Sequence, residues 1–206
     1  TLLGATQWLG SLPLDFWVPE AYVFLVLYSL PHLALAEIAL LWSLLFLLDA
    51  FRRNSPWRAV AAGCCALVMT IIVPFYPLVL AAILGVFFLI LMLRRKRVPW
   101  PELGLAALAG LFCAPVIIYN IWLTSTEPVY QTWANQLQIL SPHPLHYLLG
   151  YAPLLIPAVW GLKNLMQDRR AGLVASDLRS WWLVLAWLMA APILIYLPFI
   201  SQRRLI

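Results

Sequence analysis

The sequence predicts an all-α protein, a polytopic transmembrane helix bundle of about six spans preceded by an N-terminal interfacial or re-entrant segment. Composition is the first reason. Of the 206 residues, 64% are hydrophobic and 10% are charged, whereas a soluble domain carries about 25% charged residues. The second reason is that the apolar runs are long and continuous, which favours helices over the short alternating segments of a β-barrel.

Residues 1–30 predict an extracytoplasmic or interfacial segment. The run is apolar but is interrupted by glycine, proline and acidic residues, and its last ten residues are too short to cross a bilayer. Its tryptophan and tyrosine side chains suit the headgroup level of a membrane. Asp15 and Glu20 stand five residues apart with aromatic residues between them, so each is a candidate catalytic base.

Four predicted spans follow, within a helix-bundle region that covers residues 31–200. Proline at position 31 favours a helix start, because its missing N–H is not needed in the first turn. The segment 31–50 rises about 30 Å, which is enough to cross the hydrocarbon core. A proline turn at 74–77 and a basic run at 94–97 separate the later spans. Their expected limits are 57–73, 78–93 and 102–123.

Two further spans complete the predicted bundle. Residues 124–146 form its one long polar segment, and a fifth span follows at 147–162, where two prolines predict a kink. A short polar loop then leads to the last span at 180–200. We expect residues 201–206 to form an extracytoplasmic basic end.

The basic residues predict which side of the membrane each loop faces. If the loop after the first span is cytoplasmic, alternation of the spans puts eleven of the thirteen Lys and Arg residues on that side, as the positive-inside rule requires. The net charge of +5 therefore reflects topology and does not indicate nucleic acid. The other side receives the prolines, histidines and polar segments. We expect binding or chemistry on this extracytoplasmic face.

Arg203 and Arg204 break the positive-inside rule, because alternation places them on the extracytoplasmic side. Guanidinium groups bind phosphate oxygens in a bidentate manner, so this pair, with the adjacent Gln202, is a candidate clamp for a lipid phosphate. The competing interpretation is that both side chains simply reach the headgroups.

Glu37 is the one acid expected inside a span away from its ends. It lies six residues after Pro31, about 9 Å along the predicted helix. A carboxylate at that depth is costly unless it is protonated, paired or solvated, so it is a candidate binding residue or a neutral packing residue. His32 is five positions away, about 140° around the helix, so the two do not form a dyad.

The long polar segment holds the remaining candidates. His143 and His146 lie in a proline-rich run that suits a substrate-facing loop. A divalent metal ion is possible there, but at least one further ligand is needed, and no metal site is assigned. Trp133 lies among aromatic and amide side chains. That composition suits contact with a sugar, and it equally suits a plain membrane-interface helix.

Three short motifs carry a resemblance to a known family. They are Pro-His-Leu-Ala-Leu-Ala at 31–36, His-Pro-Leu-His-Tyr-Leu-Leu-Gly-Tyr at 143–151, and Tyr-Leu-Pro-Phe at 196–199 before Gln202. Together with the short paired spans, they resemble the C-type integral-membrane glycosyltransferases of bacteria. That family includes relatives of protein O-mannosyltransferases and aminoarabinose transferases.

The resemblance implies an enzyme that transfers a sugar from a polyprenyl-phosphate donor on the extracytoplasmic face, with membrane lipids around it. Arg203 and Arg204 match the phosphate-binding role that it implies. The family carries its catalytic acid in a first extracytoplasmic loop, which here is absent or only partly represented. We expect the chain to be a fragment, because it lacks an initiator Met and stops soon after the arginine pair.

Two other classes of protein remain open. The chain suits a non-catalytic transmembrane subunit of a larger respiratory or photosynthetic complex, in which a histidine could ligate haem or chlorophyll. Other membrane subunits would then be its partners. A transporter is the third class, although we find no internal repeat and Glu37 is the sole acid expected deep in a span.

Overall fold

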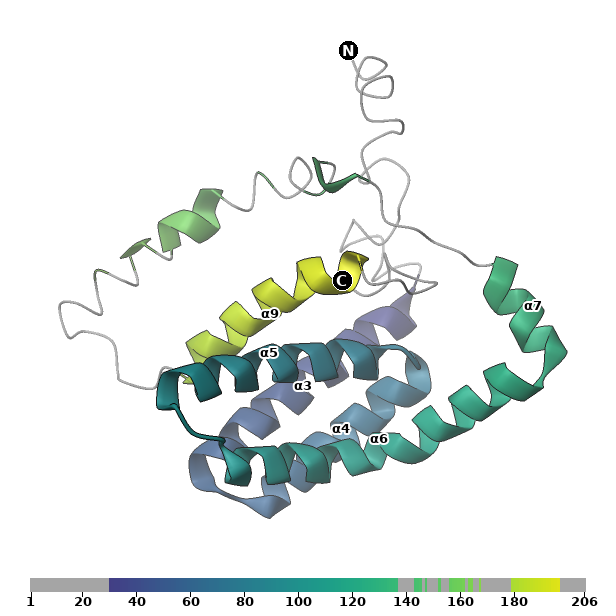
Figure 1. The fold of residues 1–206 in the computed structure, drawn as a ribbon, viewed down its shortest axis with the longest axis horizontal. Coiled ribbons are helices and arrows are strands. Elements are labelled where there is room, and N and C mark those ends of the chain that lie inside the picture. The colour runs from purple at the N-terminus through teal and green to yellow at the C-terminus, as the bar shows by residue number, and fades with distance from the viewer. Residues whose placement is uncertain are drawn as a thin grey trace, which may run out of the picture. The chain divides into compact units, whose positions relative to one another are not determined.

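The computed structural model describes residues 30–136 and 179–196, together with short pieces at 143–145, 147, 152, 156–161, 163–164 and 167. The chain divides into two compact units, Thr1–Ser29 with Pro142–Leu178 and Leu30–Ser141 with Arg179–Ile206. In the described part of the second unit every regular element is a helix, which confirms the all-α prediction (Figure 1). These helices are α3 (Pro31–Arg53), α4 (Pro56–Ile72), α5 (Tyr76–Arg95), α6 (Trp100–Thr126), α7 (Pro128–Gln136) and α9 (Arg179–Tyr196).

Three of the described helices, α3, α5 and α6, are long and apolar enough to cross a membrane. The helix α4 and the segment Ser180–Tyr196 of α9 are also apolar but shorter. All five coincide with predicted spans, so a helical membrane protein is indicated. Six crossings remain a prediction, because three described helices are long enough to cross and half of the fifth predicted span at 147–162 lies outside the described residues.

Proline and left-handed caps set the ends of the first helices. A proline occupies the first or second position of α3, α4, α5 and α6, where its missing N–H costs no hydrogen bond. The helices α3 and α5 end at residues in the left-handed conformation, Asn54 with φ 49° and Lys96 with φ 50°. Such a residue stops a helix and reverses the chain. The basic segments are therefore tight turns that return the chain into the bundle.

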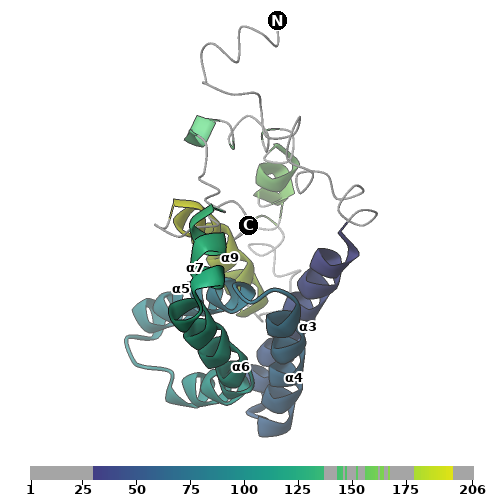
Figure 2. The same ribbon diagram turned by 90° about the vertical axis from the view of Figure 1, so that its right-hand side faces the viewer.

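The helix α4 packs against both α3 and α6, as Figures 1 and 2 show. Its buried face is made mainly of small side chains, which let the helix backbones approach closely. At Gly63 a Cβ atom would stand 2.6 Å from the Phe112 ring of α6. The buried residues of α4 are Ala59, Ala62, Gly63, Ala66, Met69 and Thr70.

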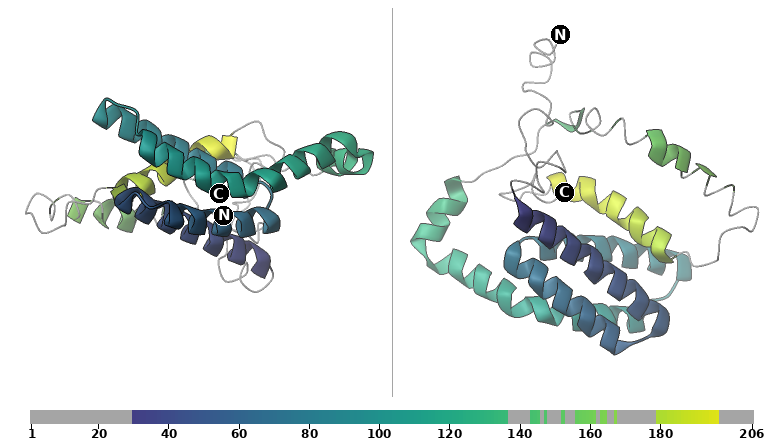
Figure 3. Two further views of the ribbon diagram at one scale, coloured as in Figure 1. Left: turned by 90° about the horizontal axis from the view of Figure 1, so that it is seen from below. Right: turned by 180° about the vertical axis from the view of Figure 1, so that it is seen from behind.

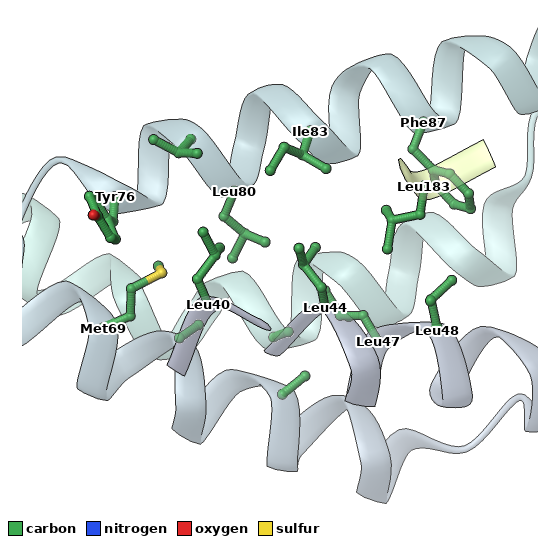
Figure 4. Packing of buried hydrophobic residues seen from close by; sticks show 14 of the residues in the cluster. Leu40, Leu44, Leu47, Leu48, Met69, Tyr76, Leu80, Ile83, Phe87 and Leu183 are labelled. Carbon is green, nitrogen blue, oxygen red and sulfur yellow. The ribbon is translucent and has the colours of Figure 1, made fainter. Parts of the chain in front are cut away.

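The helix α5 packs against α9 and faces α3 across the core. In Figure 4, Leu80 and Ile83 of α5 point toward Leu40 and Leu44 of α3. At one end of this layer Phe51 of α3 stacks on Phe87, with ring centroids 6.0 Å apart. Phe87 also packs edge to face on Phe88, with ring centroids 5.7 Å apart. One continuous apolar core thus draws on α3, α4, α5, α6 and α9.

The helix α6 leaves this core halfway along its length. Its buried residues, from Glu102 to Cys113, all precede Pro115. Proline removes one helical hydrogen bond and bends a helix. Beyond it, Ile118, Ile121 and Trp122 are exposed, and Figure 3 shows this part of α6 continuing to α7 away from the other helices.

Candidate functional site

The turns between the helices gather at two ends of the bundle. At one end lie the α3–α4 turn, the α5–α6 turn and the start of α9, toward the left of Figure 1. We call this the basic end. It contains eight of the described Lys and Arg residues, namely Arg52, Arg53, Arg58, Arg94, Arg95, Lys96, Arg97 and Arg179. The opposite end, which we call the polar end, contains the start of α3, the α4–α5 turn and the α6–α7 corner.

One acid at the basic end holds two arginines across the α3–α4 turn. The carboxylate of Asp49 accepts a hydrogen bond of 3.0 Å from Nε of Arg53, one turn further along α3. Its other oxygen pairs with Arg58 of α4. The side chains of Asp49 and Arg58 are 27% and 36% exposed, so the pairs lie at the surface and each contributes under about 1 kcal/mol. Their main effect is to neutralise charge and to fix the turn.

The start of α9 is held by arginines from two other helices. Arg52 of α3 donates a hydrogen bond of 2.7 Å from its guanidinium to the hydroxyl of Ser180. The guanidinium carbon of Arg94, at the end of α5, stands 4.2 Å from the centre of the Trp182 ring, within the range of a cation–π contact. These contacts bring together three basic segments that the topology prediction assigns to one side of the membrane.

Glu102 is a functional-looking residue that the sequence analysis missed. Nη1 of Arg95 donates a hydrogen bond of 2.7 Å to Oε1 of Glu102 across the α5–α6 turn. Glu102 is 8% exposed, which makes it the buried acid of the described chain, while Glu37 lies on the exposed side of α3. The position of Glu37 within α3 is as expected, and its role as a binding or packing residue stays a prediction. The sequence did contain a signal for this pair. Glu102 lies in the first turn of α6, where an acid is favoured, and it follows the basic run at 94–97.

Three cations at the end of α5 have no acid partner among the described residues. Arg94 rests on Trp182, while Lys96 and Arg97 are exposed at the left-handed turn after α5. The acids of this end, Asp49 and Glu102, are engaged by other arginines. The end therefore carries a local excess of positive charge beside α5.

The polar end contains Glu37, an acid of α3. Glu37 is close enough to Tyr76, the first residue of α5, for the two to interact electrostatically. The Tyr76 side chain is buried, whereas Glu37 and His32 are exposed. The structure thus places Glu37 beside the α4–α5 turn and keeps it apart from His32, as the helical spacing predicts.

The α6–α7 corner binds most of its polar groups to its own backbone. The hydroxyls of Thr124 and Thr126 donate to carbonyl groups of α6 at 2.8 Å, and Nε2 of Gln131 donates to the carbonyl of Ser125 at 2.7 Å. These donors stabilise the corner itself, so they give the sugar-contact hypothesis no support. Trp133 lies on α7, but its side chain is outside the described part.

Most of the other candidates also lie outside the described residues. These are Asp15, Glu20, His146, Gln202, Arg203 and Arg204. His143 is exposed, and its Nδ1 accepts a hydrogen bond of 3.3 Å from the backbone N–H of Leu145. Within the described ranges no three His, Cys, Asp or Glu residues are grouped as a metal site would require.

The fold and the two ends define an α-helical membrane protein whose charge is concentrated at one end of its bundle. Comparison of the chain with known protein families, with characterised proteins and with solved structures finds no match.

Proposed function

We propose that the chain is the membrane portion of a glycosyltransferase that uses a polyprenyl-phosphate-linked sugar on the extracytoplasmic face. The observation that supports this is the direction of α9. This helix starts at the basic end, beside Arg52 and Arg94. Its last described residue, Tyr196, is therefore at the opposite end, and Arg203 follows seven residues later in the sequence. With the basic end in the cytoplasm, the arginine pair belongs to the extracytoplasmic side.

The proposed reaction requires a phosphate-binding group and a base. An acceptor hydroxyl oxygen forms a bond to the anomeric carbon of the sugar, while the bond from that carbon to the phosphate oxygen breaks. The hydroxyl proton passes to a carboxylate, for which Asp15 and Glu20 are the candidates. The polyprenyl phosphate leaves with the bonding electron pair, and Arg203 and Arg204 stabilise its negative charge.

A binding measurement with a matched pair of variants tests the phosphate clamp. The probe is a short-chain polyprenyl phosphate, and the prenyl alcohol of the same length is the control ligand. The double variant Arg203→Ala, Arg204→Ala removes the proposed clamp. The double variant Arg169→Ala, Arg170→Ala removes an adjacent arginine pair that the sequence places on the cytoplasmic side.

We expect the first pair of substitutions to weaken phosphate binding by at least about tenfold per arginine, since charge-assisted bonds are worth about 1.5–3 kcal/mol each. The second pair should leave binding unchanged. Equal affinity of the wild type for the phosphate and the alcohol, or equal loss in both double variants, contradicts the clamp. Sugar transfer from the loaded donor to an acceptor then tests the activity itself.

A second candidate function, a non-catalytic subunit of a larger membrane complex, is favoured by the second half of α6. There Ile118, Ile121 and Trp122 are each more than half exposed, a surface that suits either lipid or another membrane subunit. Purification under mild conditions distinguishes these candidates. A bound pigment in the absorption spectrum, or stoichiometric partner chains, supports the subunit.

A further inference from the structure

We propose that the end of α5, formed by Arg94, Lys96 and Arg97, binds the phosphate headgroup of an anionic phospholipid. This site is at the basic end, so it is separate from the proposed donor site and does not depend on it. The inference starts from how the charges of this end are distributed. Asp49 engages Arg53 and Arg58, and Glu102 engages Arg95. Arg94, Lys96 and Arg97 thus place at the end of α5 three positive charges that no described acid offsets.

The contact with the Trp182 ring holds the Arg94 side chain in place and leaves it able to bind an anion. The face of the ring holds the guanidinium group at 4.2 Å, and a cation–π contact uses the flat face of that group rather than its N–H donors. The N–H groups lie in the plane and remain able to donate to phosphate oxygens. Holding the side chain in place also lowers the entropy lost when a ligand binds.

An exposed apolar stripe on α5 leads directly to these cations. Leu89 and Leu93 are 54% and 72% exposed, and they are four residues apart, so they lie on one face of the helix. Lys96 follows one turn after Leu93, just past the end of α5. A lipid with its phosphate on the basic residues can therefore lay an acyl chain along the two leucines. A soluble anionic partner would leave this stripe uncovered.

Aromatic side chains mark the same level of the membrane. Trp100, at the start of α6, is 73% exposed, and Trp182 lies at the start of α9 under Arg94. Tryptophan is enriched where headgroups meet hydrocarbon. The cations are thus placed at headgroup depth, with apolar surface on their membrane side.

The test compares two double variants that each remove two positive charges from the basic end. Lys96→Gln with Arg97→Gln removes two of the three cations of the proposed site, whereas Arg53→Gln with Arg58→Gln removes the arginines that Asp49 engages. Binding of phosphatidylglycerol and of phosphatidylcholine to the whole purified chain is measured by native mass spectrometry. Inorganic phosphate is titrated separately as a competitor, and circular dichroism confirms that each variant is folded.

We expect the wild type to prefer phosphatidylglycerol, and Lys96→Gln with Arg97→Gln to lose about 25-fold in affinity, since each basic residue near an anionic surface contributes about fivefold. The other double variant should lose less than threefold. Equal losses in both variants would reduce the effect to net charge and overturn the site. So would full displacement of the lipid by millimolar phosphate.

A measurement on the unaltered protein keeps the proposal open to refutation if a variant does not fold. High salt screens exposed charges. At about 1 M salt the wild type should therefore bind phosphatidylglycerol with the same affinity as phosphatidylcholine. A preference that persists at that salt concentration contradicts a phosphate site built on exposed cations.

Discussion

Replacement of Gly63 by alanine tests the close packing of α4 on α6. An added Cβ would lie 2.6 Å and 2.9 Å from two carbons of the Phe112 ring, and 3.1 Å from the carbonyl oxygen of Ala109. The ring can rotate, but the carbonyl belongs to the α6 backbone and moves only with the helix. Inserting a methyl group into packed structure costs about 1–3 kcal/mol, and the gain in helix propensity over glycine returns about 1 kcal/mol.

We therefore expect Gly63→Ala to lower the free energy of unfolding by up to about 2 kcal/mol, which corresponds to up to about 8 °C in melting temperature for a chain of this size. Gly110→Ala is the matched control, since a Cβ at Gly110 in α6 meets nothing within 4 Å. Alanine there should leave stability unchanged or raise it by up to about 1 kcal/mol. Thermal unfolding in detergent measures both variants.

A further substitution separates a steric clash from other effects. Phe112→Leu removes the ring that the new methyl group would meet, so Gly63→Ala should cost less in that background than in the wild type. The reasoning is refuted if Gly63→Ala and Gly110→Ala melt at the same temperature. It is also refuted if the cost of Gly63→Ala is unchanged in the Phe112→Leu background.

Three further substitutions test the ends and the core. Asn54→Ala should destabilise by about 1 kcal/mol and Asn54→Gly should not, because Asn54 has a positive φ; equal melting of the two would contradict the left-handed cap. Arg95→Gln should lower stability by about 1–3 kcal/mol through loss of the charged partner of the buried Glu102, and a wild-type melt would show the pair to be neutral. Phe87→Ala should cost about 3–5 kcal/mol, because its ring is fully buried against Phe51, and a cost below 1 kcal/mol, roughly that of a surface change, would contradict this core.

The helices themselves were predictable because prolines and basic runs divide the apolar sequence. Pro31 begins α3 as expected, and the turn at 74–77 separates α4 from α5. The prediction of one long polar segment at 124–146 was only partly right. The helix α6 continues to Thr126, and α7 starts at Pro128. Helical conformation is disfavoured directly before proline, and Glu127 accordingly has an extended backbone between the two helices.

The buried faces were not predictable in the same way. In a chain this apolar, hydrophobic periodicity does not distinguish a face packed on protein from one exposed to lipid. The burial of small residues on α4, such as Ala62 and Ala66, is a property of packing between helices. For the same reason the sequence placed Glu37 along α3 but did not indicate that its side chain lies on the exposed side of the helix.

The candidate sites were likewise predictable only in part. The grouping of the basic turns followed from the positive-inside rule, and the contacts of Arg52 and Arg94 with α9 agree with it. The pairing of Arg95 with Glu102 was missed, because sequence alone does not say which acid a turn will bring to an arginine. The proposed phosphate clamp at Arg203 lies outside the described residues and remains a prediction.

The orientation of the bundle is the claim on which the rest of the account depends, and cysteine labelling tests it most directly. In a variant without Cys64, Cys65 and Cys113, single cysteines are introduced at Asn54, Lys96 and Glu127. A membrane-impermeant maleimide is then applied to intact and to lysed spheroplasts. If α4 crosses the membrane and the basic end is cytoplasmic, positions 54 and 96 react only after lysis, and position 127 reacts in intact spheroplasts. Reaction of 54 and 96 from opposite sides would show that α4 does not cross, and reaction of both in intact spheroplasts would invert the proposed topology.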